Sequence, residues 1–151
     1  MAVGTVKQIY MVIGCPGSGK SWVCTRLIAE YQYVRHDSFI GADYVAEIVR
    51  QAKTATKPLL IETPFSVSQI KDPLELQEFR VTPVFIIEQP DVVRQRYRTR
   101  EGKDIPAGHL SRQATYEQRA RAWQAFRGTS DQVLAYLKNA APQKKERYPW
   151  E

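Results

Sequence analysis

Short apolar runs alternate with longer amphipathic stretches along the chain. The apolar runs predict buried parallel strands, and they lie at 9–13, 33–35, 58–62 and 84–87. Apolar residues at helical spacing predict helices at 20–31, 40–52, 67–79, 91–100, 110–126 and 130–138, the third interrupted by Pro73. Strands that alternate with helices predict an α/β fold with three layers. We expect a parallel sheet of four or five strands with helices on both faces.

The length of 151 residues and a hydrophobic content of 43% predict one domain with a core of its own. No apolar run approaches the roughly 20 residues of a membrane helix, and the first residues lead into a strand without a signal-peptide cleavage site. Cys15 and Cys24 are expected to be reduced and packed, which predicts a cytoplasmic protein. The domain is expected to cover 1–141, followed by a flexible polar tail at 142–151.

The net charge of +6 comes from one stretch of the chain. Residues 1–93 carry 9 basic and 10 acidic side chains, residues 94–127 carry 9 and 3, and residues 128–151 carry 4 and 3. A field of this kind attracts nucleotide phosphates or a nucleic-acid backbone. A solvated helix face is the alternative for 112–127. A solvated helix face does not explain residues 94–100 well, because arginines at every second position are distributed around a helix and do not share one face. We expect a helical, basic lid at about 94–112.

A glycine-rich segment follows the first predicted strand with the spacing Gly-x4-Gly-Lys-Ser. It comprises Gly14, Cys15, Pro16, Gly17, Ser18, Gly19, Lys20 and Ser21. Glycines let backbone N–H groups converge on phosphate oxygens, and the following helix points its positive end at them. Lys20 would neutralise the outer phosphates, and the Ser21 hydroxyl would be a magnesium ligand. The segment therefore predicts binding of ATP with Mg²⁺.

Several enzyme classes share this loop, so the reaction depends on other residues. A GTPase switch needs guanine-reading motifs, and Asn-Lys-x-Asp does not occur in the sequence. A mechanical ATPase carries an apolar strand that ends in aspartate, whereas residues 59–62 end in Glu62. A kinase needs less: the loop, a carboxylate that takes the acceptor's proton, and lid arginines.

Two carboxylates follow predicted strands. Asp37 comes just after the second strand and is the candidate general base, with a helix N-cap as an equal alternative. Glu62 ends the third strand and is either a magnesium ligand through water or a strand-end residue. His36 and His109 are interpreted as structural or solvated rather than catalytic.

These segments resemble the polynucleotide-kinase-like P-loop kinases of phages. Residues 13–21 match that family's loop nearly letter for letter, and 35–37 stand where the family has a basic residue before its catalytic aspartate. Arg96-x3-Arg100-x2-Lys103-x2-Pro106, followed by Leu110, is similar to the family's lid. The resemblance implies that Lys20 and Ser21 bind ATP and magnesium and that Asp37 is the general base. It also implies that Arg100 reaches the transferred phosphate, with Arg96 beside it.

Two departures from the family concern the acceptor. Ile40 stands where the 5′-end kinases have an arginine that holds the acceptor's phosphate, and Glu62-Thr63 replaces Asp-Thr. A related phage class phosphorylates the hydroxymethyl group of 5-hydroxymethyluracil in DNA. Such a base would be flipped into an apolar pocket. The residues available for it, as pocket or as core, are Phe39, Ile40, Tyr44 and Phe65.

Three hypotheses follow. The first is a DNA kinase that acts on a hydroxymethylated base or a 5′-hydroxyl end. The second is a small-molecule kinase for a nucleoside, nucleotide or antibiotic, in which the basic stretch serves ATP alone. The third is a non-catalytic ATP-binding module, for which replacement of Asp37 would leave function intact.

Overall fold

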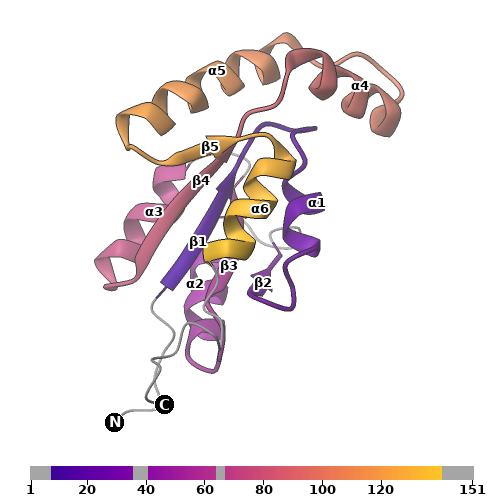
Figure 1. Cartoon of the computed structure of the whole chain (residues 1–151). Coiled ribbons are helices and arrows are strands. Elements are labelled where there is room, and N and C mark those ends of the chain that lie inside the picture. The colour runs from indigo at the N-terminus through magenta and orange to yellow at the C-terminus, as the bar shows by residue number, and fades with distance from the viewer. Residues whose placement is uncertain (1–7, 36–40, 64–66, 141–151) are drawn as a thin grey trace.

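A computed structural model describes residues 8–35, 41–63 and 67–140 (Figure 1). The strands form a five-stranded sheet in the order β2-β3-β1-β4-β5, and every neighbouring pair is parallel. They are β1 (Gln8–Ile13), β2 (Gln32–Val34), β3 (Leu59–Thr63), β4 (Arg80–Ile86) and β5 (Phe126–Gly128). The helices are α1 (Lys20–Thr25), α2 (Gly41–Ala52), α3 (Val67–Leu76), α4 (Pro90–Glu101), α5 (Ala107–Ala122) and α6 (Ser130–Ala140).

The sheet is covered on both faces, because successive side chains of a strand point to opposite sides. In β1, Ile9, Met11 and Ile13 pack into one core with residues of α2 and α3, and Val12 packs into a second core with α1 and α6. Helices α4 and α5 lie beyond the carboxyl ends of the strands (Figure 1). The predicted three-layer α/β fold is confirmed.

Helix α1 is shorter than the predicted helix at 20–31. It ends at Thr25, after which Arg26, Leu27 and Glu30 continue in turns that donate to carbonyl groups three residues earlier. Leu27 is fully buried, whereas the neighbouring Ile28 is 61% exposed, so the predicted apolar stripe is wrong at Ile28. The turns are required because the chain must return to β2 at Gln32, directly after Tyr31.

The end of α5 also differs from the prediction. The helix ends at Ala122 rather than 126, Gln124 adopts a left-handed φ of 54°, and the chain enters β5. This three-residue strand was not predicted. It pairs with β4, and its Phe126 ring stacks on the Tyr136 ring at 4.2 Å between centroids. The predicted interruption at Pro73 is wrong, because α3 continues through it and buries Ile70 and Leu74 on either side.

Cys15 and Cys24 are both buried, which agrees with the predicted packing of these side chains. No helix in the described ranges is both long and apolar enough to cross a bilayer. The predicted tail at 142–151 lies outside the described residues.

We predict that two neighbouring substitutions, Leu27→Ala and Ile28→Ala, differ sharply in their effect on stability. Leu27→Ala should lower the free energy of unfolding by about 2–5 kcal/mol, because it leaves a cavity in the core between the sheet, α1 and α6. Ile28→Ala should change it by less than about 0.5 kcal/mol, because the side chain is exposed. Urea denaturation followed by circular dichroism measures both values. Equal losses would mean that α1 continues beyond Thr25.

Candidate active site

The phosphate loop runs from the end of β1 into α1, and its path depends on two glycines. Gly17 has a φ of 86° and Gly19 a φ of 105°, both in the left-handed region that favours glycine. A Cβ on Gly17 would lie 3.1 Å from the Val93 carbonyl oxygen, and one on Gly19 would lie 3.2 Å from Arg96 Nη1. The absence of these side chains therefore lets α4 pack directly on the loop.

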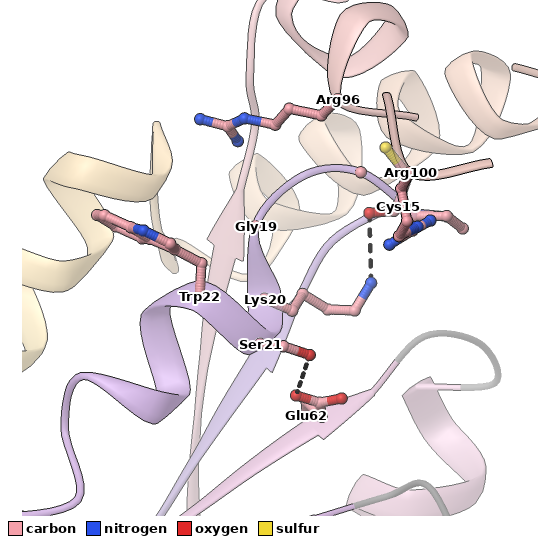
Figure 2. A pocket seen from close by; sticks show the side chains of 10 residues that line it. Cys15, Gly19, Lys20, Ser21, Trp22, Glu62, Arg96 and Arg100 are labelled. Carbon is pink, nitrogen blue, oxygen red and sulfur yellow. Dashed lines mark hydrogen bonds between the residues drawn. The ribbon is translucent and has the colours of Figure 1, made fainter. Parts of the chain in front are cut away.

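A pocket of about 430 Å³ opens at the loop (Figure 2). Its lining residues are Cys15, Pro16, Gly17, Gly19, Lys20, Ser21, Trp22, Glu62, Arg96 and Arg100. Every one of these except Trp22 was singled out from the sequence. The fold thus brings together the predicted loop, the predicted metal ligands and the predicted lid arginines.

Lys20 lies across the mouth of the loop. Its Nζ donates hydrogen bonds to the carbonyl oxygens of Gly14 and, at 3.3 Å, of Cys15. Burial lowers the pKa of Lys20 to about 8, and the nearby Glu62 carboxylate offsets part of this effect. The Lys20 ammonium is therefore poorly solvated and would be stabilised by an anion that entered the pocket.

The two predicted metal ligands lie side by side in this pocket (Figure 2). Ser21 Oγ lies 3.5 Å from Glu62 Oε2, and Glu62, at the end of β3, is only 7% exposed. Tyr33 on β2 donates a 2.6 Å hydrogen bond to the same carboxylate oxygen, and burial together with this bond raises the pKa of Tyr33. Tyr33 was not identified from the sequence, although its place on the neighbouring strand could have indicated it.

These oxygens fit a magnesium ion, which usually takes one or two protein oxygens together with waters and substrate phosphates. Within the described ranges, no cluster of three or more histidine, cysteine, aspartate or glutamate side chains could hold a metal. The donor set of Ser21 and Glu62 is thus of the kind that suits Mg²⁺ carried by a nucleotide, and does not suit a metal caged by protein alone.

Arg96 connects four parts of the structure. Its Nη1 donates to the Ser18 carbonyl oxygen at 2.9 Å and to Glu88 Oε2 at 3.3 Å, and its Nη2 donates to Ser130 Oγ at 3.3 Å. Glu88 is 7% exposed and also accepts from Ser130 N at 2.8 Å and Ser130 Oγ at 2.6 Å. These hydrogen bonds join α4 to the loop, to the segment after β4 and to the start of α6. The residues that make them are Arg96, Glu88 and Ser130.

Arg100, one helical turn after Arg96, has different surroundings. It lies on the side of the pocket that holds Cys15 and the Lys20 ammonium, whereas the Arg96 guanidinium points toward the side of Trp22 (Figure 2). Its Nε donates to Glu101 Oε2 at 2.9 Å, and its side chain is 57% exposed. Of these two arginines, Arg100 is the one whose exposed side chain lies next to Lys20.

Gln113 fastens α5 to the loop and was not identified from the sequence. Its side-chain oxygen accepts from Cys15 Sγ at 3.7 Å and from Glu88 N at 3.2 Å, and its Nε2 donates to the Glu88 carbonyl at 2.8 Å. Burial raises the pKa of the Cys15 thiol, with Lys20 and Arg112 offsetting part of the rise. Cys15 is therefore a neutral donor that positions the loop, in agreement with the packing role expected for it.

The remaining predicted residues lie elsewhere. Asp37 lies outside the described residues, as do His36, Phe39, Ile40 and Phe65. Tyr44 is fully buried, donates to the Val34 carbonyl at 2.8 Å and accepts from Glu62 N at 3.2 Å, so its alternative role in a substrate pocket is wrong. Burial and Arg112 lower the pKa of His109, whose ring meets the Tyr97 ring edge-on at 5.5 Å, as expected for a structural histidine.

Comparison with solved structures identifies the fold. A gluconokinase from Sinorhizobium meliloti 1021 superposes with a TM-score of 0.60 at 18% identity, over 90% of this chain and 94% of that chain. A Deinococcus radiodurans tunicamycin resistance protein gives 0.62 at 17% identity, over 91% and 99%. A sugar kinase from Janibacter sp. HTCC2649 gives 0.53 at 16% identity, over 88% and 93%.

No protein-family model matches the chain, and no curated protein sequence matches it significantly. At identities below 20%, the likeness to the solved structures concerns the fold. The chain therefore has the fold of a P-loop kinase.

Proposed function

We propose that this protein is an ATP-dependent kinase that transfers the γ-phosphate to a hydroxyl group. The observation that supports this most directly is the meeting of Lys20, the Ser21–Glu62 pair and Arg100 in one pocket at the phosphate loop. A poorly solvated ammonium, two oxygen ligands for a metal and an exposed guanidinium are the groups that phosphoryl transfer requires.

Each of these groups has a separate task. The loop amides and Lys20 bind the phosphates, and Ser21 and Glu62 would hold Mg²⁺. When bound, the metal would supply positive charge that offsets the negative charge of the phosphates. Arg100 stabilises the charge that spreads over the transferred phosphoryl group. Asp37, assigned from the sequence alone, accepts the proton of the acceptor hydroxyl.

The nucleoside end of ATP is assigned to the other end of the pocket. Lys20, Glu62 and Arg100 mark the end where transfer occurs, and Trp22 lies at the opposite end (Figure 2). Trp22 is 38% exposed, and the Arg26 guanidinium lies 4.2 Å from its ring centroid. An indole partly exposed in a nucleotide pocket offers a surface on which adenine can stack.

The acceptor that we propose first is a hydroxyl on DNA, either the hydroxymethyl group of 5-hydroxymethyluracil in phage DNA or a 5′-hydroxyl end. The basic stretch at 94–127 and the resemblance of the loop and lid to the phage kinases support this acceptor. Glu62 at the end of β3 is compatible with it, because glutamate and aspartate both offer carboxylate oxygens to a metal.

A small-molecule acceptor is the second candidate, and two observations favour it. A gluconokinase and a sugar kinase share the fold. In addition, many charges of the basic stretch are balanced by nearby carboxylates, in the pairs Arg94–Asp91, Arg98–Asp104, Arg100–Glu101 and Arg121–Glu117. Local pairing weakens the long-range field that would attract a nucleic acid.

Transfer of labelled phosphate tests the function and separates the acceptors. With γ-labelled ATP and Mg²⁺, we expect label on DNA that contains 5-hydroxymethyluracil or on dephosphorylated DNA ends. Lys20→Met should lower the rate by about 10²-fold or more, because it removes a charge that stabilises the transferred group. Lys53→Met, a matched change at an exposed site, should leave the rate unchanged. Label only on gluconate, nucleosides or nucleotides would select the second candidate, and absence of both transfer and ATP binding would refute the proposal.

Replacement of the two lid arginines should affect different quantities, kcat for Arg100 and the free energy of unfolding for Arg96. Arg100→Lys should lower kcat by about 10-fold or more with little change in stability, because lysine keeps the charge but loses the planar fork. Arg96→Gln should lower the free energy of unfolding by about 1–3 kcal/mol, because the buried Glu88 carboxylate loses a charged donor. Steady-state kinetics and urea denaturation of both variants provide the comparison. A stability loss in Arg100→Lys as large as in Arg96→Gln would contradict these roles.

The binding of ATP should depend on pH through Lys20. Its pKa of about 8 means that the free protein loses the ammonium charge as the pH rises above that value. Phosphate oxygens would raise this pKa, so binding takes up a proton. The affinity should be full below pH 8 and fall above it by up to about tenfold per pH unit, the limit for one proton. Calorimetry with a non-hydrolysable ATP analogue from pH 7 to 9.5 measures the trend, and Lys20→Met should abolish it. Constant affinity over this range would show that ATP binding does not depend on the protonation of Lys20.

A further inference from the structure

A second groove lies between the first turn of α3 and one face of α5. It is lined by Val67, Ser68, Gln69, Arg112, Thr115, Tyr116 and Arg119. The α5 residues follow the spacing i, i+3, i+4 and i+7, which places them on one face of that helix. None of the seven lining residues is acidic, and the first turn of α3 holds no acidic residue either. Helix α3 therefore presents its positive end to the groove without a neutralising carboxylate.

Two arginines give the groove its charge. Arg112 and Arg119 both line it, and the Arg119 guanidinium lies 5.5 Å from the centroid of the Trp123 ring. Both guanidiniums also act on Tyr116 between them: burial raises the pKa of this phenol, and each arginine offsets part of the rise. Arg112 and Arg119 thus lie on either side of Tyr116 along the groove face of α5.

The carboxylate of α5 is engaged elsewhere. Glu117 pairs with Arg121 at 3.3 Å and with Arg127 at 3.8 Å, and it is not among the residues that line the groove. The acid of α5 is thus directed to Arg121 and to Arg127 of β5, and the groove residues include two arginines and no carboxylate. Ser68, Gln69 and Thr115 add neutral hydrogen-bonding side chains to the same surface.

The groove begins beside the phosphate loop. Arg112 precedes Gln113, whose side-chain oxygen accepts from Cys15 Sγ of the loop at 3.7 Å. Cys15 lies on the side of the pocket that holds Arg100 and the Lys20 ammonium (Figure 2). From Arg112 the groove follows α5 to Arg119, a rise of about 10 Å at 1.5 Å per residue. Arg112 is thus the groove residue on the side of the loop, and an acceptor with its hydroxyl at the transfer end of the pocket would reach the groove there.

We propose that the groove binds an anionic group of the acceptor, a phosphate or a carboxylate, through Arg112 and Arg119. This inference rests on the proposed kinase function and narrows its substrate class. Guanidinium groups pair with phosphate and carboxylate oxygens through two parallel hydrogen bonds, which a neutral polyol cannot match. The enzyme should therefore select acceptors that carry a negative charge near the hydroxyl over neutral acceptors of similar shape.

Calorimetric titration with the phosphate loop saturated by Mg²⁺ and a non-hydrolysable ATP analogue tests the groove separately from the loop. The anionic probes are an oligonucleotide of eight thymidines with a 5′-hydroxyl end, and gluconate. Thymidine and glucose are their neutral counterparts. We expect at least one anionic probe to bind at least tenfold more tightly than its neutral counterpart. Binding of the oligonucleotide supports a nucleic-acid phosphate as the anion, and binding of gluconate supports the carboxylate of a small acceptor.

Charge-matched variants on one helix locate the binding. Arg112→Gln and Arg119→Gln should each lower the affinity for the anionic probe at least tenfold and leave the affinity for the neutral probe unchanged. Arg121→Gln, an equal change of charge at an exposed position of the same helix, should weaken it less than threefold. If Arg119→Gln and Arg121→Gln lowered the affinity for the anionic probe equally, the binding would come from the general positive charge of the helix and the proposed site in the groove would be refuted.

A further variant keeps the test decisive if an arginine variant is unstable. Thr115 is exposed, so Thr115→Glu adds a carboxylate to the groove without removing packing, and it should also weaken the anionic probe at least tenfold. Thermal melts show that each variant is folded. Normal binding of the anionic probe by folded Thr115→Glu would overturn the proposal.

Failure of the groove and failure of the kinase function are distinguishable in these experiments. If the groove variants change neither ATP binding nor phosphate transfer, the proposed anion site is refuted and the kinase function remains supported. If the protein does not bind ATP but the anionic probes bind in the groove, the kinase function is refuted and the groove remains supported as an anion site.

Discussion

The path of the backbone between β1 and α1 is the constraint on which the rest of the site depends. A phosphate loop must turn its amide groups inward, and here it does so with two glycines in the left-handed region. Helices α4 and α6 approach closely at these positions, because a Cβ on Gly17 would lie 3.1 Å from the Val93 carbonyl oxygen and one on Gly19 would lie 3.1 Å from Ser130 Cβ and 3.2 Å from Arg96 Nη1. The same glycines that shape the phosphate cradle therefore also bring the basic helix onto it.

The central place of β1 in the sheet gives the loop two carboxylates with different surroundings. Glu62 comes from β3 and meets the Ser21 hydroxyl, while Glu88 follows β4, on the other side of β1, and meets Arg96 and Ser130. Glu88 is satisfied by several hydrogen-bond donors, which makes it a structural anchor. Glu62 accepts its one short hydrogen bond from Tyr33 and lies beside the nucleotide pocket, where lone pairs can serve a metal. Two similar residues at the ends of neighbouring strands thus take on different tasks.

The features that the sequence predicted are those whose signal is local. The loop motif, the buried strands and the basic helix each depend on residues within about twenty positions of one another, so period and spacing were sufficient. Contacts between distant residues were not predictable: Gln113 meets Cys15 across 98 positions, and Arg96 meets Ser130 across 34. For the same reason Arg96 and Arg100 were expected to act together, although only one of them is tied to a buried carboxylate. The end of α1 and strand β5 were missed because both depend on where the chain must return to the sheet, which no local pattern encodes.

The distribution of positive charge changes the meaning of the net charge of +6. Arg94 is balanced by an acid one turn away and Arg98 by an acid of the adjoining loop, so their fields fade within a short distance at physiological salt. Arg96 is bound to Glu88 and holds the loop. The charges of the proposed site are then Lys20 and Arg100 in the pocket at the loop, and Arg112 with Arg119 in the second groove. A short-range arrangement of this kind discriminates by the position of an anion relative to the acceptor hydroxyl, because guanidinium pairs act at hydrogen-bond distance. Net basicity alone would attract any polyanion, whereas two arginines at fixed positions on one rigid helix select among them.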